Sequence, residues 1–82
     1  MINNTDVEIF PNQTNSIITF NFRKGAEADF RVFDQLGKLV WYQPNVSLNQ
    51  PYSIDISELS NGVYFIRINS EIGTITKRVL KE

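Results

Sequence analysis

The sequence predicts an all-β domain, a seven-stranded immunoglobulin-like antiparallel β-sandwich. Segments rich in β-branched and aromatic residues recur about every ten residues, and clusters of Asn, Gly, Pro and Asp separate them. No stretch has the apolar spacing of a long amphipathic helix. Seven short strands within 82 residues suit one small sandwich.

Alternating apolar and polar side chains define the expected strands. They lie, in chain order, at residues 7–10, 16–22, 28–33, 38–43, 52–56, 63–69 and 74–80. The second, third and fifth strands each have one apolar face, and these faces should form the core through Ile18, Phe20, Phe22, Phe30, Val32, Ile54 and Ile56. The sixth strand is apolar on most of both faces, which predicts a central position. The seventh carries charge among its apolar residues, which is typical of an edge strand.

The connections also have recognisable sequences. Asp34 to Gly37 predicts a hairpin with a bulge, because Asp hydrogen-bonds its own turn and Gly adopts left-handed backbone angles. Residues 57–62 start with a polar cap and end at Gly62, which predicts a single helical turn that places Leu59 on the core. Residues 44–51 are expected to form the longest loop.

Length and composition limit what the chain can be. A single domain of 82 residues buries about 60% of its unfolded surface, so its stability should be modest. Eight basic and nine acidic residues provide no net field for nucleic acid or an anionic membrane. No apolar run approaches the roughly 20 residues of a membrane helix, and the first residues do not resemble a signal peptide. Residues 1–6 are expected to be a linker remnant or an added start, and residues 7–82 the domain.

No residue pattern indicates catalysis. The chain has no Cys and no His, which removes thiolate chemistry, the commonest general base and the commonest metal ligand. Asp34 and Asp55 are explained by backbone bonding in turns, and no acidic cluster has calcium-loop spacing. We therefore expect no enzyme activity and no cofactor. A surface cation between loops remains open.

Two features leave alternatives open. Trp41, Tyr42 and Tyr52 are suited either to stacking on a sugar or to packing at the rim of the core. The charges of Lys77, Arg78 and Lys81 suit either recognition by a partner or protection of an edge strand against aggregation.

Five segments follow one another along the chain: residues 9–12 (IFPN), 32–40 (VFDQLGKLV), 54–59 (IDISEL), 61–64 (NGVY) and 76–79 (TKRV). In this order they resemble the type A C-terminal sorting domain of proteins exported by the type IX secretion system of Bacteroidetes. One departure is Gln13, where the family usually has a second proline. The positions expected to determine the fold are Pro11, Asn12, Asp34, Gly37, Leu59, Gly62 and Tyr64.

The resemblance implies a C-terminal secretion signal that directs an upstream passenger protein across the outer membrane. The implied partners are the passenger, the outer-membrane translocon and a sortase-like peptidase, which removes the domain. The implied location is the periplasm in transit, then the cell surface or the medium. Lys77, Arg78, Val79 and Lys81 are expected to contribute to recognition, because an edge strand offers unpaired backbone groups to a partner. The same edge allows a homodimer to form by strand pairing.

Two other functions fit the same fold. One is a carbohydrate-binding module of a secreted multidomain protein, with Trp41 in its site. The other is a passive fibronectin-like spacer between domains.

Overall fold

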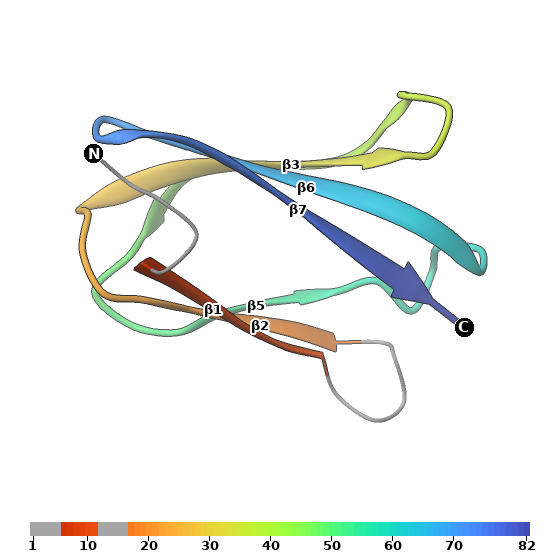
Figure 1. The fold of residues 1–82 in the computed structure, drawn as a ribbon, viewed down its shortest axis with the longest axis horizontal. Coiled ribbons are helices and arrows are strands. Elements are labelled where there is room, and N and C mark those ends of the chain that lie inside the picture. The colour runs from red at the N-terminus through yellow and green to blue at the C-terminus, as the bar shows by residue number, and fades with distance from the viewer. Residues whose placement is uncertain (1–5, 12–16) are drawn as a thin grey trace.

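The computed structural model describes residues 6–11 and 17–82, which form two facing antiparallel sheets (Figure 1). The smaller sheet has the order β1-β2-β5 and the larger β4-β3-β6-β7. The strands are β1 Val7–Pro11, β2 Ile17–Phe22, β3 Glu27–Asp34, β4 Leu39–Ser47, β5 Tyr52–Asp55, β6 Gly62–Ser70 and β7 Gly73–Lys81. The predicted seven-stranded sandwich is confirmed, with β6 inside its sheet and β7 at an edge.

The inner faces of the two sheets form one apolar core. Phe30 of β3 is fully buried, and its ring lies 5.4 Å from that of Phe20 and 4.9 Å from that of Tyr52, measured between centroids. Among the described residues no polar or charged side chain is buried. The buried residues are Val7, Ile18, Phe20, Ala28, Phe30, Val32, Val46, Leu48, Ile54, Ile56, Tyr64, Ile66, Ile68 and Ile75. Phe22, expected in the core, packs against it while partly exposed.

The predicted loop at residues 44–51 was wrong in its first half, because β4 continues to Ser47. Pro44 is tolerated because β4 is an edge strand that pairs with β3 alone. On the open side of such a strand, the missing N–H of a proline removes no hydrogen bond between strands. Asn45 has a left-handed φ of 56°, and its backbone N–H donates to Asp29 Oδ1 at 3.1 Å. This bond holds the irregular part of β4 against β3.

The connection between β5 and β6 is a short turn. The Leu59 N–H donates to the Ile56 carbonyl at 3.0 Å, and the Ser57 N–H donates to Asp55 Oδ1 at 2.9 Å. Leu59 packs partly buried against the core, as predicted. The expected helical turn is instead a single hydrogen-bonded turn, since β5 ends at Asp55 and its carboxylate organises the first residues of the connection.

Stability should fall in acid through two surface carboxylates. The backbone N–H of Ser57 lowers the pKa of Asp55, and the backbone N–H groups of Glu71 and Ala26 lower that of Glu71. A group with a lowered folded-state pKa stabilises the fold fully above its unfolded pKa, about 4 for these side chains, and loses this effect as the pH falls further. Urea midpoints at pH 7 and pH 3 should therefore differ less for Asp55→Asn than for the unaltered protein. Glu58→Gln is the matched control, and an equal change in both variants would contradict this assignment.

Candidate functional site

Several turns and strand ends lie together at one end of the sandwich. The β3–β4 hairpin, the turn before β6 and the last residues of β7 occupy the end opposite to the start of β1 (Figure 1). The strand register agrees, because Asp34 lies opposite Tyr64, and Gly62 lies opposite Lys81. We call this the carboxyl end of β7.

The β3–β4 hairpin at this end is held by Asp34. Its Oδ1 accepts hydrogen bonds from the backbone N–H groups of Leu36 and Lys38, both at 2.9 Å. Its carbonyl accepts from the Gly37 N–H at 3.0 Å, and Gly37 has a φ of 88°. A β-branched or bulky side chain is strained at this φ. The predicted hairpin is therefore present, and it leaves Leu36 90% exposed at its tip.

Tyr64 joins the turn before β6 to the core. Its ring is buried, and its hydroxyl donates to the Ser60 carbonyl at 2.6 Å. A tyrosine near the start of this strand that bonds back to the preceding turn is a recurring feature of immunoglobulin-like sandwiches. Tyr64 thus fixes the position of Gly62, whose φ of 150° turns the chain into β6.

Removal of this hydroxyl should destabilise the domain moderately. Tyr64→Phe keeps the buried ring and loses one hydrogen bond, so we expect a loss of about 1 kcal/mol in the free energy of unfolding. Urea denaturation followed by circular dichroism measures it. Tyr42→Phe is the control, because the Tyr42 side chain is 45% exposed. Equal losses in the two variants would show that the hydroxyl of Tyr64 has no special role.

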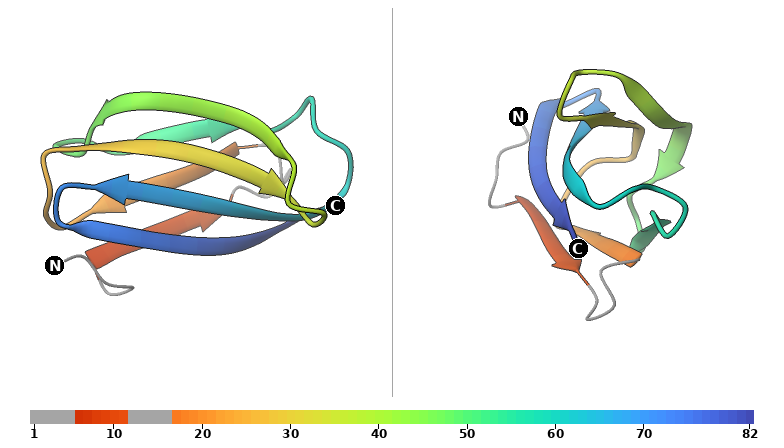
Figure 2. Two further views of the ribbon diagram at one scale, coloured as in Figure 1. Left: turned by 90° about the horizontal axis from the view of Figure 1, so that it is seen from above. Right: turned by 90° about the vertical axis from the view of Figure 1, so that its right-hand side faces the viewer.

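The β7 strand offers a long open edge. Its nine residues pair with β6 from Gly73 to Lys81 without any register shift, and no described strand pairs with its other side. Figure 2 shows β7 and β1 along one side of the sandwich and β4 and β5 along the other. The outward backbone N–H and C=O groups of β7 are therefore available to a partner.

The other strands at sheet edges are less suited to pairing. β4 has two register shifts against β3 and contains Pro44. β5 has four residues and follows Pro51, and β1 has five and ends at Pro11. Short strands, irregularities and prolines are the devices that protect sheet edges from pairing. Among the described strands, β7 has the longest regular open edge.

The four predicted recognition residues lie on both faces of β7. Lys77, Val79 and Lys81 share the inward face with buried Ile75, and Arg78 points outward from the larger sheet. The ammonium group of Lys81 donates to Asn61 Oδ1 at 3.5 Å, across to the turn before β6. The structure thus gathers these residues on one strand, but in two different environments.

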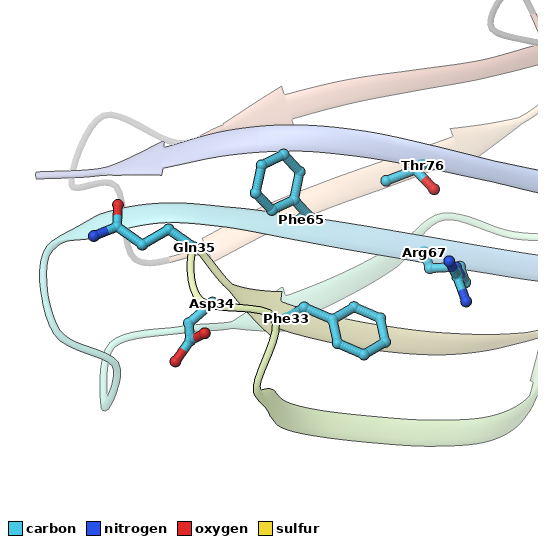
Figure 3. Close-up of a pocket in the computed structure, with 7 residues that line it drawn as sticks. Phe33, Asp34, Gln35, Phe65, Arg67 and Thr76 are labelled. Atoms are coloured by element: carbon cyan, nitrogen blue, oxygen red, sulfur yellow. The ribbon is translucent and has the colours of Figure 1, made fainter.

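A shallow groove of about 480 Å³ lies beside β7 on the outer face of the larger sheet (Figure 3). Four side chains line this groove: Phe33 of β3, Phe65 and Arg67 of β6, and Thr76 of β7. The hairpin at Asp34 lies at one end of it. Sequence reasoning missed this site. Alternation within β6 places Phe65 and Arg67 on one face, but only the pairing between strands brings Phe33 and Thr76 beside them.

A comparison with known families decides the identity of the chain. The model of the secretion system C-terminal sorting domain matches residues 8–82. The chain belongs to this family. This sorting domain is a secretion signal of the type IX system, and it directs export toward the cell surface or the extracellular space. Neither this family nor the immunoglobulin-like fold is an enzyme family.

The fold of this sorting domain also occurs in a solved structure. A DUF3244 family protein from Bacteroides vulgatus, described as an immunoglobulin-like β-sandwich, superposes with a TM-score of 0.80. The match covers 94% of the sorting domain and 85% of that protein at 16% sequence identity, so it shows the shared fold alone. No curated protein sequence matches the chain.

The aromatic residues considered for sugar binding in the sorting domain do not form one platform. Trp41 and Tyr52 pack against the core with their ring centroids 6.5 Å apart. Tyr42 lies on the other face of β4, opposite Arg31 of β3. Burial raises the pKa of Tyr52.

Within residues 6–11 and 17–82, no group of three acidic side chains is placed to hold a metal ion. In the same residues no helix has the length and apolarity needed to span a membrane.

The first of the five segments that resemble the sorting-domain family is residues 9–12. Its Pro11 ends β1, and its Asn12 lies outside the described residues.

Proposed function

We propose that the type IX secretion machinery reads this sorting domain by adding a strand to β7. The observation that carries the proposal is the open edge of β7, which stays in register with β6 over nine residues while the other sheet edges are short or interrupted. An added strand forms backbone hydrogen bonds for affinity, and side chains beside it provide selectivity. Lys77, Arg78, Val79 and Lys81 flank such a strand on both faces.

The domain acts in this proposal as an address on a longer protein. The passenger precedes the sandwich, the domain folds in the periplasm, and the outer-membrane translocon receives the folded domain. A sortase-like peptidase then cuts before β1, and the passenger is released or joined to surface lipopolysaccharide. The catalytic residues for this cut belong to the peptidase, which agrees with a sorting domain from a family that is not enzymatic.

A reporter protein tests this function directly. The reporter carries a periplasmic signal peptide at its start and this chain at its end, and it is expressed in a bacterium with a working type IX system. We expect the reporter at the cell surface or in the medium. The control is the same reporter without the chain, which should stay in the periplasm. Equal export of the two would contradict the proposed function.

A further inference from the structure

Three arginines lie on the outer face of the larger sheet. Arg31 of β3 lies opposite Arg67 of β6 in the strand register, and Arg78 of β7 lies opposite Phe65. Opposed residues of an antiparallel pair share one face. Glu27 and Asp29 lie on the same face nearer the start of β3, so the positive charge is concentrated around Arg31, Arg67 and Arg78 in a protein whose net charge is −1.

Two of these arginines are held against aromatic rings. The Arg31 guanidinium lies 4.6 Å from the centroid of the Tyr42 ring, and that of Arg67 lies 5.6 Å from the centroid of Phe33. Stacking of this kind fixes the plane of the guanidinium and leaves N–H donors at its edge for an oxygen acceptor. The side chains are therefore arranged before any ligand arrives.

No described carboxylate forms an ion pair with these arginines. The ion pair that the structure contains joins Lys24 to Asp6 and does not include them. Asp29 lies on the same face of β3, two residues before Arg31, and it accepts a hydrogen bond from the Asn45 N–H of β4. Asp34, at the end of β3, accepts hydrogen bonds within its own hairpin. Within the part of the chain that the structure describes, the guanidinium groups have no anionic partner.

Apolar side chains adjoin the arginines at the carboxyl end of β7. Leu39 and Leu80 are 47% and 52% exposed, and Leu36 projects from the hairpin tip. Phe33 of β3 lies between two apolar residues in the strand register, Leu39 of β4 on one side and Phe65 of β6 on the other. Exposed apolar side chains beside charged groups are typical of a protein-binding site. We call this surface the arginine face; its residues are Arg31, Phe33, Phe65, Arg67, Thr76 and Arg78, and the exposed Leu39 and Leu80 adjoin it.

We propose that the arginine face binds an acidic protein segment that also carries apolar side chains. Stacked guanidinium groups form paired hydrogen bonds with carboxylates, and the leucines and phenylalanines beside them take up the apolar residues. The inference rests on the proposed function, since the partner is the component that adds a strand to β7. Arg78 and Thr76 belong both to β7 and to this face, so one bound segment reaches both surfaces.

Other occupants fit the face less well. An anionic polysaccharide provides negative charge but no apolar side chains for the leucine end. A second copy of this chain would place the same three arginines against each other, because a two-fold interface uses one patch on both copies. Both occupants are distinguishable outcomes of the experiment below.

Charge reversal in the exported reporter tests the proposal. We expect Arg31→Glu with Arg67→Glu to lower surface export at least tenfold, because carboxylates on both sides repel. Arg31→Lys with Arg67→Lys should give an intermediate loss, since lysine keeps the charge and loses the stacked planar geometry. Arg23→Glu, one charge reversal of the same kind in the exposed connection after β2, is the control and should export normally. Circular dichroism of each purified variant establishes that it is folded.

Photo-crosslinking identifies the occupant. Thr76→p-benzoylphenylalanine places a reactive group in the groove of the exported reporter. We expect a crosslink to a secretion-system protein at a segment containing Asp or Glu, and its loss in the double Glu variant. Exchange of the partner's acidic residues for Lys should then restore export of that variant.

Several results would overturn the proposal. They are a crosslink to polysaccharide, a crosslink to a second copy, a protein segment without carboxylates, no crosslink during active export, or unchanged export of the folded double Glu variant. Each leaves the sorting function intact, because the unaltered reporter is still exported. Failure of the unaltered reporter to reach the surface would instead contradict the proposed function itself.

Discussion

A proline on β7 at a position where the backbone N–H faces outward is expected to reduce reporter export about tenfold or more while the sandwich stays folded. Proline removes one hydrogen-bond donor from the open edge and adds a ring where an incoming strand would lie. The loss of one backbone bond and the added clash together amount to more than about 1.4 kcal/mol, which corresponds to a factor of ten in affinity.

Two adjacent proline substitutions distinguish an effect on the open edge of β7 from an effect on folding. Backbone N–H groups alternate along a strand, so one of Thr76→Pro and Lys77→Pro removes a bond to β6 and the other removes only an outward donor. Urea denaturation identifies the second as the variant with the smaller loss of stability. Normal surface export of that variant, measured by protease accessibility of the reporter, would show that β7 does not receive a strand.

Phe30→Ala is expected to remove a large part of the stability of the domain. The Phe30 side chain has no exposed surface and contacts Phe20, Phe22 and Tyr52 from the facing sheet. Loss of such a ring costs about 3–5 kcal/mol, whereas a domain of this size has a total stability of roughly 4–12 kcal/mol. Near-ultraviolet circular dichroism and a urea titration measure the folded fraction.

The matched control for Phe30 is another phenylalanine. Phe10 of β1 is 51% exposed, so Phe10→Ala should cost no more than about 1 kcal/mol. Similar losses in the two variants would mean that the aromatic cluster is not the centre of the core. The comparison also tests whether export needs a folded signal. Phe30→Ala should lower export of the reporter, and Phe10→Ala should leave it unchanged.

Local patterns in the sequence were sufficient for the strands and most of the core. Alternation identified Phe20, Phe30 and Ile54 as inward-facing, because a strand presents successive side chains to opposite faces regardless of its partner. The hairpin at Asp34 was predictable for a similar reason. Its hydrogen bonds lie within five residues, so the turn depends on no distant contact.

Features that depend on the pairing between strands could not be predicted in this way. The groove beside β7 joins Phe33, Phe65 and Thr76, which are neighbours only after three strands align. The extension of β4 through Pro44 was missed because proline usually ends a strand, and its tolerance here depends on an edge position that the sequence does not encode locally.

The opposite placement of the two ends of the sandwich has a mechanical consequence. The domain is 32 Å long, and a passenger joined before Asp6 leaves it at the end where β1 starts, far from the Asp34 hairpin and the last residues of β7 (Figure 1). We therefore expect a bulky passenger to leave that end of the signal accessible to a receptor. One receptor geometry is thus expected to serve cargo of very different size and shape, with no need for a spacer matched to each cargo.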